Sequence, residues 1–127
     1  MHAASGFVPG KLMLAGEYAV LGPGGRALAV AVGELVHWQT APGPPSLVLQ
    51  AYDRVFRWQP GRPAPAGIAA YAVAAATAFA AIGLPLSSPV QLRAAGRLGG
   101  RKLGLGTSAG VVVATGEAIA AAHGRAF

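Results

Sequence analysis

Short apolar runs separated by glycine- and proline-rich segments fill much of the chain. Runs of this length, rich in Val, Leu and aromatic residues and bounded by turn-forming residues, predict β-strands. Pro9-Gly10 predicts a bend between the first two strands, because proline lacks an N–H donor and restricts the residue before it. The predicted strands cover residues 7–8, 11–15, 27–38, 47–49, 55–58 and 89–94.

A longer alanine-rich stretch, residues 68–82, has the length and spacing of a helix, and Gly83 and Pro85 provide its stop signal. Its bulky apolar residues fall along one helical stripe, which predicts that this stripe is buried: Ile68, Tyr71, Phe79 and Ile82. Residues 64–92 carry no charge and are long enough to cross a bilayer. The interspersed Gly, Pro and Ser residues nevertheless favour a buried helix of a soluble protein, and we expect no membrane partner.

Glycines and hydroxyl residues gather directly before a second predicted helix, residues 107–122. Glycines let backbone N–H groups approach a ligand closely, and the start of a helix adds unpaired N–H groups and the positive end of its dipole. This combination predicts a phosphate-binding loop formed by Gly104, Leu105, Gly106, Thr107, Ser108 and Ala109. Lys102 would add a positive charge, and the Ser108 hydroxyl could bind Mg²⁺.

The spacing of this loop differs from that of two common phosphate loops. In GxxxxGK[ST] the lysine follows the last glycine, whereas Lys102 precedes the loop. No glycine stands three residues after Gly106, so the dinucleotide fingerprint is also absent. Taken alone, the stretch is therefore open to a second interpretation, a flexible glycine-rich turn whose Thr and Ser cap an ordinary helix.

Composition sets further bounds. A chain of 127 residues is one domain at most, and its 54% hydrophobic content indicates a globular protein. The absence of cysteine excludes disulfides and thiolate metal sites and fits a cytoplasmic protein, and the first residues do not resemble a signal peptide.

The formal net charge of +6 has two interpretations. It serves to attract nucleotides and phosphorylated substrates, or it follows from a GC-rich coding sequence that favours arginine. No RNA-binding pattern occurs, so we expect no nucleic-acid partner.

Residues 9–21, Pro-Gly-Lys-Leu-Met-Leu-Ala-Gly-Glu-Tyr-Ala-Val-Leu, add a second motif. Pro9-Gly10-Lys11 and Gly16-Glu17-Tyr18 resemble the first motif of the GHMP kinase superfamily. Residues 104–109 resemble its second, phosphate-binding motif, Gly-Leu-Gly-Ser-Ser-Ala. Two motifs in this order are a stronger signal than either alone. Within the superfamily the chain is most similar to the phosphomevalonate kinases, with the mevalonate kinases as the alternative.

The resemblance implies an α+β fold in which residues 1–127 form the N-terminal, ATP-binding domain, a ribosomal-protein-S5-like mixed or antiparallel sheet packed with helices. It implies ATP and Mg²⁺ as cofactors and a phosphorylated small-molecule substrate, 5-phosphomevalonate, converted to 5-diphosphomevalonate. Residues 104–109 and Lys102 would hold the ATP phosphates, Ser108 would bind Mg²⁺, and Lys11 would offset charge on the transferred phosphoryl group. The residues that it assigns to the substrate side are Lys11, Glu17 and Tyr18.

Two departures from the family pattern matter. Thr107 stands where the usual motif has its first serine, which keeps a hydroxyl but stiffens the side chain. The sequence also ends at Phe127, before the region where family members carry the catalytic aspartate, the third motif and the C-terminal domain. Asp53, the only aspartate, lies upstream in a predicted strand region and is not assigned that role. We therefore expect an incomplete domain that needs a C-terminal domain or a second chain for catalysis. A non-catalytic module that binds an anion or a partner chain is the alternative of another class.

Basic residues lead up to the glycine-rich loop and lie either on a solvated edge or near the phosphates: Arg93, Arg97, Arg101 and Lys102. His37 has no partner histidine at metal-ligand spacing, which favours a structural role. Trp38 and Trp58 are predicted to pack within strands rather than to form a base-binding platform.

Overall fold

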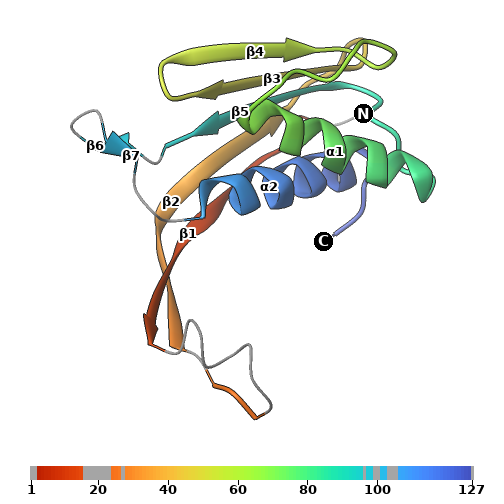
Figure 1. Ribbon diagram of the computed structural model, residues 1–127. Coiled ribbons are helices and arrows are strands. Elements are labelled where there is room, and N and C mark those ends of the chain that lie inside the picture. Colours follow the sequence, from red (N-terminus) through yellow and green to blue (C-terminus); the bar gives the residue numbers. More distant parts are fainter. Residues whose placement is uncertain are drawn as a thin grey trace.

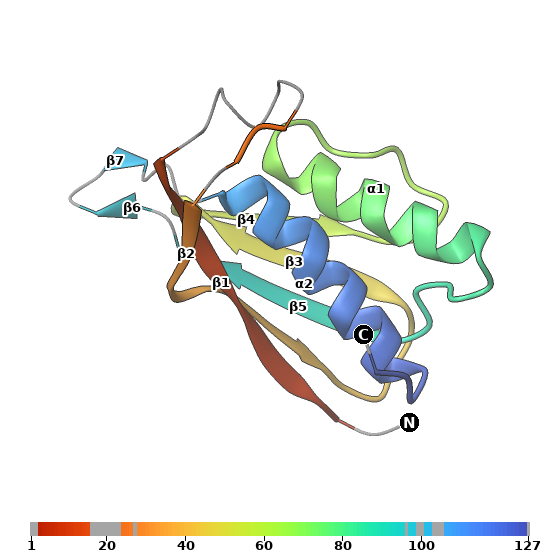
Figure 2. The same cartoon turned by 90° about the horizontal axis from the view of Figure 1, so that it is seen from below.

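The computed structural model describes residues 3–15, 24–26, 28–95, 97–98, 101–102 and 106–126. Within these residues the chain forms a five-stranded sheet, a separate two-stranded ribbon and two helices. Both helices lie on one face of the larger sheet and leave its other face open (Figure 1 and Figure 2). The predicted α+β fold is confirmed, and of the two sheet types left open, mixed or antiparallel, the structure has the mixed one.

The elements follow one another as β1 (Ser5–Ala15), β2 (Leu28–Thr40), β3 (Ser46–Ala51), β4 (Arg54–Trp58), α1 (Ile68–Ala81), β5 (Pro89–Ala94), β6 (Arg97–Leu98), β7 (Arg101–Lys102) and α2 (Thr107–Ala122). The larger sheet has the strand order β1-β2-β5-β3-β4. Its neighbouring strands are antiparallel except β3 and β5, which run parallel. A parallel pair needs a long crossover, which β4 and α1 provide here.

Alternating side chains along β3 and β5 separate the core from the open face. Leu47 and Leu49 of β3 and Val90 and Leu92 of β5 are buried. Successive residues of a strand point to opposite faces, so the residues between them lie on the face away from the helices. The described part of this open face is largely polar, and its members on β3 and β5 include Gln50, Gln91 and Arg93.

The two strands predicted on either side of Pro9-Gly10 are one strand, β1, and the predicted break corresponds to an irregularity in its pairing with β2. The chain accommodates the proline by a register shift, in which residues 33–35 of β2 lie opposite Pro9 alone. Gly33 has φ 57°, a conformation that a residue without Cβ adopts at little cost. Beyond this irregularity β1 and β2 remain paired with each other and extend past the other strands of the sheet (Figure 1).

A two-residue turn joins β3 to β4. Its residues, Tyr52 and Asp53, have φ values of 52° and 64°. Two successive positive φ angles are typical of the type I′ turn, whose twist matches that of a β-hairpin, and aspartate tolerates this conformation better than most residues. Asp53 therefore lies in the turn of a hairpin, between the two strands that were predicted on either side of it.

Helix α1 buries its small residues rather than the predicted bulky stripe. Tyr71 and Ile82 are 49% and 72% exposed, while Ile68 and Phe79 pack only partly against the core. The buried positions are Ala69, Ala72, Val73, Ala75 and Ala76. Small side chains allow a closer approach between packed elements, which favours the alanine face as the contact surface. Neither helix among the described residues is long and apolar enough to span a membrane.

Helix α2 lies beside α1 on the same face of the sheet and supplies the centre of the core (Figure 2). Its buried core residues include Val111, Ala114 and Ile119. Gly110 lies where the helix crosses β2, and a Cβ at this position would stand 3.1 Å from Cγ2 of Val36. The missing side chain lets the first turns of α2 approach the strand closely.

The two tryptophans both pack against the core, as predicted. Trp38 is buried, and its Nε1 donates a hydrogen bond to Glu117 of α2. Trp58 donates from Nε1 to the carbonyl oxygen of Arg62 at 3.0 Å. Both indoles thus have a hydrogen-bond acceptor as well as apolar contacts, which is how partly buried tryptophans are usually accommodated.

Candidate phosphate-binding site

The candidate site is built where α2 begins, directly after the glycine-rich loop. Gly106 is the N-cap residue and has the left-handed angles φ 78° and ψ 38°. Its carbonyl oxygen accepts a helical hydrogen bond from the Gly110 N–H at 2.8 Å. A side chain in this conformation would be strained, so the sharp entry into the helix depends on glycine.

The first turn of α2 offers backbone donors to a ligand. The first N–H groups of an α-helix have no carbonyl partner within the helix. No side chain among the described residues caps them, and the first turn holds no acidic residue. The positive end of the helix dipole is therefore not offset by a carboxylate of its own first turn. Donors arranged in this way bind phosphates and other anions.

Lys11 lies beside this turn although it belongs to the first strand. A Cβ on Gly106 would stand 4.0 Å from both Cβ and Cε of Lys11. The aliphatic stem of Lys11 therefore lies near Gly106, the residue from which α2 begins. The side chain is exposed, so its charge is accessible to a ligand. The fold thus brings together one residue from each of the two sequence motifs.

The two predicted hydroxyls have different surroundings. Thr107 is 6% exposed, and its Oγ1 has no hydrogen-bond partner among the described residues. Ser108 is half-buried and Ala109 is exposed. A buried hydroxyl without a partner costs about 1–3 kcal/mol, so the first turn contains a polar group that a further partner would stabilise.

The donor set fits Mg²⁺ only if the ion arrives with a nucleotide. In the described part of the chain, no group of His, Cys, Asp or Glu residues could hold a metal ion by itself. Mg²⁺ in proteins usually keeps several waters and binds through substrate phosphates together with a few protein oxygens. The half-buried Ser108 hydroxyl, at a helix start that favours phosphate, is a suitable protein oxygen of this kind.

Several predicted site residues lie outside the described residues: Glu17, Tyr18, Gly104 and Leu105. The backbone of Lys102 belongs to β7, paired with Arg97 of β6, but its side chain is not among those described. The roles assigned to these residues therefore stay predictions.

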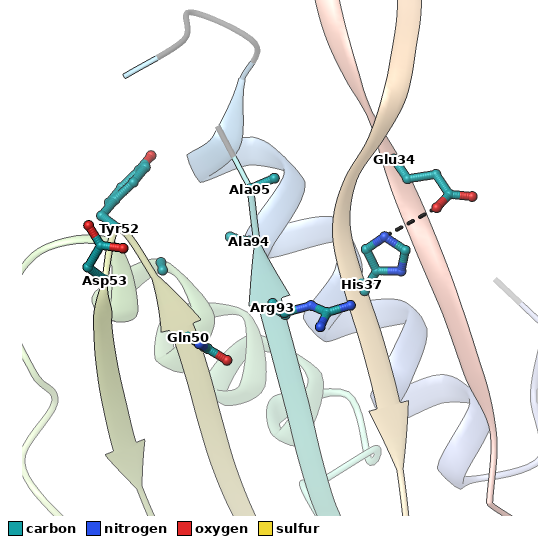
Figure 3. A pocket seen from close by; sticks show the side chains of 9 residues that line it. Glu34, His37, Gln50, Tyr52, Asp53, Arg93, Ala94 and Ala95 are labelled. Carbon is teal, nitrogen blue, oxygen red and sulfur yellow. Dashed lines mark ion pairs between the residues drawn. The ribbon is translucent and has the colours of Figure 1, made fainter. Parts of the chain in front are cut away.

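Arg93 lies away from the candidate site. It belongs to β5 and points to the open face of the sheet, where Figure 3 shows it directed toward His37. The helices, including the start of α2, lie on the opposite face. The interpretation in which Arg93 approaches the phosphates together with the glycine-rich loop is therefore not supported.

The sequence interpretation missed a hollow on this open face, next to the turn between β3 and β4. It is lined by polar residues from β2, β3, β5 and the turn, among them Glu34, Gln50 and Asp53 (Figure 3). His37 Nε2 lies 3.3 Å from Oε2 of Glu34 at its edge. The feature of the sequence that could have indicated it is the alternation of polar with apolar residues along β2, β3 and β5, which predicts a polar open face.

A scan against protein-family models finds no match, and a search of curated protein sequences finds none either. Solved structures do match. Phosphomevalonate kinase from Streptococcus pneumoniae, in complex with phosphomevalonate and AMPPNP, aligns with a TM-score of 0.73 and 25% identity. The Lin0012 protein from Listeria innocua aligns with a TM-score of 0.66 and 29% identity. Mevalonate kinase from Methanococcus jannaschii aligns with a TM-score of 0.68 and 16% identity. At this identity the similarity shows a shared fold and nothing further.

These alignments cover 96% to 100% of this chain but only 36% to 41% of the other three. The chain therefore spans well under half the length of the proteins that it resembles. The five-stranded mixed sheet with its two helices matches the N-terminal part of such kinases. The structural neighbours of this chain thus include phosphomevalonate kinase and mevalonate kinase, and its fold is that of the N-terminal domain of the GHMP kinases.

Proposed function

We propose that residues 1–127 form the ATP-binding domain of a GHMP-type small-molecule kinase, and that the substrate is 5-phosphomevalonate. The observation that carries the proposal is the closeness of Lys11 to Gly106 at the uncapped start of α2. The reaction would transfer the γ-phosphoryl group of ATP to the substrate phosphate and yield ADP and 5-diphosphomevalonate. We place it in the cytoplasm, where ATP is supplied.

In this proposal the chain contributes positioning and charge stabilisation, which are the main protein contributions to phosphoryl transfer. The N–H groups of the first turn of α2 hold phosphate oxygens, and Gly106 permits their close approach. Lys11, whose stem lies near Gly106, offsets negative charge on the transferred group with its ammonium. Lys102 and residues 104–105 complete the phosphate cradle.

The Ser108 hydroxyl would hold Mg²⁺ together with the nucleotide phosphates, and the ion would supply charge neutralisation there. Ser108 then serves to orient the metal–nucleotide complex relative to Lys11. Glu17 and Tyr18 are proposed to contact the substrate.

Two observations favour 5-phosphomevalonate over mevalonate. The identity to the S. pneumoniae phosphomevalonate kinase is 25%, against 16% for the M. jannaschii mevalonate kinase. The S. pneumoniae enzyme binds phosphomevalonate together with AMPPNP. A phosphorylated acceptor also requires more positive charge than an alcohol, and Lys11 and Lys102 are available for it.

The complete reaction is proposed to need groups that this chain does not supply. The chain contains one aspartate, Asp53, and it lies in the β3–β4 turn on the open face, away from Lys11 and Gly106. A catalytic carboxylate and the remainder of the acceptor site would come from a C-terminal domain or a second chain. The 127 residues alone are then expected to bind ATP without turning it over.

Calorimetric titration of the 127-residue chain with AMPPNP, with and without Mg²⁺, tests the nucleotide site. We expect saturable binding that is strengthened by Mg²⁺ and weakened by Lys11→Met or Ser108→Ala. Binding that neither substitution changes would overturn the proposed site and favour a non-catalytic module. Phosphorylation assays with 5-phosphomevalonate and mevalonate, on a polypeptide that also carries the C-terminal domain, then test the substrate. Preference for mevalonate would leave the kinase assignment intact and correct only the acceptor.

A further inference from the structure

Two adjoining hollows cross the open face of the larger sheet. The first has a volume of about 560 Å³ and lies at the turn between β3 and β4 (Figure 3). The second, of about 400 Å³, lies over the middle of the sheet. Both are lined by His37, Gln50 and Arg93, so they are neighbours on this face. Volumes of several hundred Å³ are typical of small-molecule sites.

The second hollow combines positive charge with amide groups. Its polar lining consists of His37, Gln39, Gln50, Arg57, Gln91 and Arg93. No aspartate or glutamate lines it, whereas the first hollow contains Glu34 and Asp53. The carboxylate of Glu34, which lines the first hollow and not the second, lies 3.3 Å from His37. The charge of the second hollow is therefore positive.

The sheet register explains why these groups share one hollow. One cross-strand row contains Gln39, Gln91, Val48 and Arg57, and the next contains His37, Arg93, Gln50 and Val55. The arginines thus stand in neighbouring rows, and both line the space above Gln50 and Gln91. Gln39 Nε2 donates to Gln91 Oε1 at 2.6 Å, which holds the Gln91 amide and leaves its NH₂ group as a donor.

Neither guanidinium group has a hydrogen bond or ion pair with another described residue. Two positive charges over the same hollow repel each other, and an oxyanion between them would relieve this repulsion. Guanidinium groups bind carboxylates and phosphates through paired N–H donors, and the glutamine amides add neutral donors. We propose that this hollow binds a small molecule with two anionic groups, a dicarboxylate or a phosphorylated carboxylate. It lies on the face opposite α2, so its ligand is separate from a nucleotide at the candidate phosphate site.

Amide NMR titration of the full 127-residue chain with malonate and with pyrophosphate tests this proposal. We expect saturable shifts at open-face residues such as Gln50 and Gln91. Arg57→Gln and Arg93→Gln should each raise the dissociation constant at least about tenfold, because each removes a charge-assisted contact. Arg54→Gln is the matched control. Arg54 is on the same strand as Arg57 but pairs with the buried Ala51, on the face toward the helices.

Chemical-shift changes that do not saturate would overturn the proposal. So would changes that persist in both arginine variants while the spectra show that these variants are folded. Shifts confined to the first turn of α2 would assign the anion to the candidate phosphate site and also overturn it. Lys11→Met separates the two sites, since it should leave open-face binding unchanged whether or not the kinase proposal holds. If the hollow binds oligothymidylate but neither malonate nor pyrophosphate, its ligand is a nucleic-acid strand and the proposal of a small anion is overturned.

Discussion

Nε1 of Trp38 donates a hydrogen bond of 2.9 Å to Oε2 of Glu117, which ties β2 to the second half of α2. The indole also covers Gly6 of β1, where an added Cβ would stand 2.7 Å from a ring carbon. The contact is charge-assisted and partly buried, and such hydrogen bonds are stronger than neutral ones. It fixes α2 along the sheet, and the other end of the same helix carries the candidate phosphate site.

Replacing Trp38 by Phe should therefore destabilise the fold by about 1–3 kcal/mol, because the partly buried Glu117 carboxylate loses its donor. Glu117→Gln should cost less, since an amide oxygen still accepts the hydrogen bond. In the double variant, the two effects should not add, because both act on one interaction. Urea unfolding followed by circular dichroism measures all three variants. Strict additivity would show that the two side chains act independently.

Gly110 gives a second prediction. An added methyl group at this position would stand 3.1 Å from Cγ2 of Val36 and 3.4 Å from Cδ2 of Leu35, which are 0% and 3% exposed. Overpacking typically costs about 1–3 kcal/mol, against a gain of roughly 1 kcal/mol for alanine over glycine in a helix. Because Val36 is β-branched and enclosed, we expect Gly110→Ala to lower stability overall.

Removing the opposing methyl groups tests the cause of that loss. In a Val36→Ala background the Gly110→Ala substitution should become neutral or stabilising, because the helix propensity gain then lacks a steric penalty. The unfolding free energies of the four proteins in this cycle give the answer. A loss of the same size in both backgrounds would contradict the steric explanation.

Two glycines at opposite ends of α2 form a matched pair for the candidate site. Gly106 has φ 78° at the start of the helix, and Gly124 has φ 71° just after its end. Alanine at either position should cost on the order of 1 kcal/mol, since both conformations disfavour a Cβ. Only Gly106→Ala should also weaken AMPPNP binding, because only this residue faces Lys11 and the first turn. Equal nucleotide affinity in the two variants would remove Gly106 from the site.

Most of the elements were predictable, because length, alternation and turn residues determine them locally, whereas the α+β arrangement was expected only from the resemblance to the GHMP kinases. The second helix was predicted over residues 107–122, the range that the structure shows. The face of α1 was not predictable from apolar size alone. Its orientation follows from close packing, in which alanines contact the sheet and α2, while Tyr71 and Ile82 lie exposed.

The two motifs of the candidate site were predictable from the sequence, but their closeness in the folded chain was not. Gly106 and Lys11 are distant in the sequence, and they come close together because α2 packs across β1 and β2. The Trp38–Glu117 bond and the open-face hollow depend on strand order and register, which a single sequence does not specify. Arg93 illustrates the difficulty, since its closeness to the loop in sequence left the phosphate site and a solvated edge both open, and its position in β5 puts it on the other face.

The charge of Lys11 is the subject of the last prediction. Lys11→Met keeps an aliphatic stem that can lie along Gly106 but removes the ammonium group, so the fold should be unaffected while AMPPNP binding weakens about tenfold. Raising the salt concentration should reduce the difference between the two proteins, because salt screens the exposed charge of the native lysine. Arg125→Gln removes an equivalent charge beyond the far end of α2 and serves as the control. If the arginine variant loses as much affinity as Lys11→Met, the net charge of +6 rather than a local contact attracts the nucleotide.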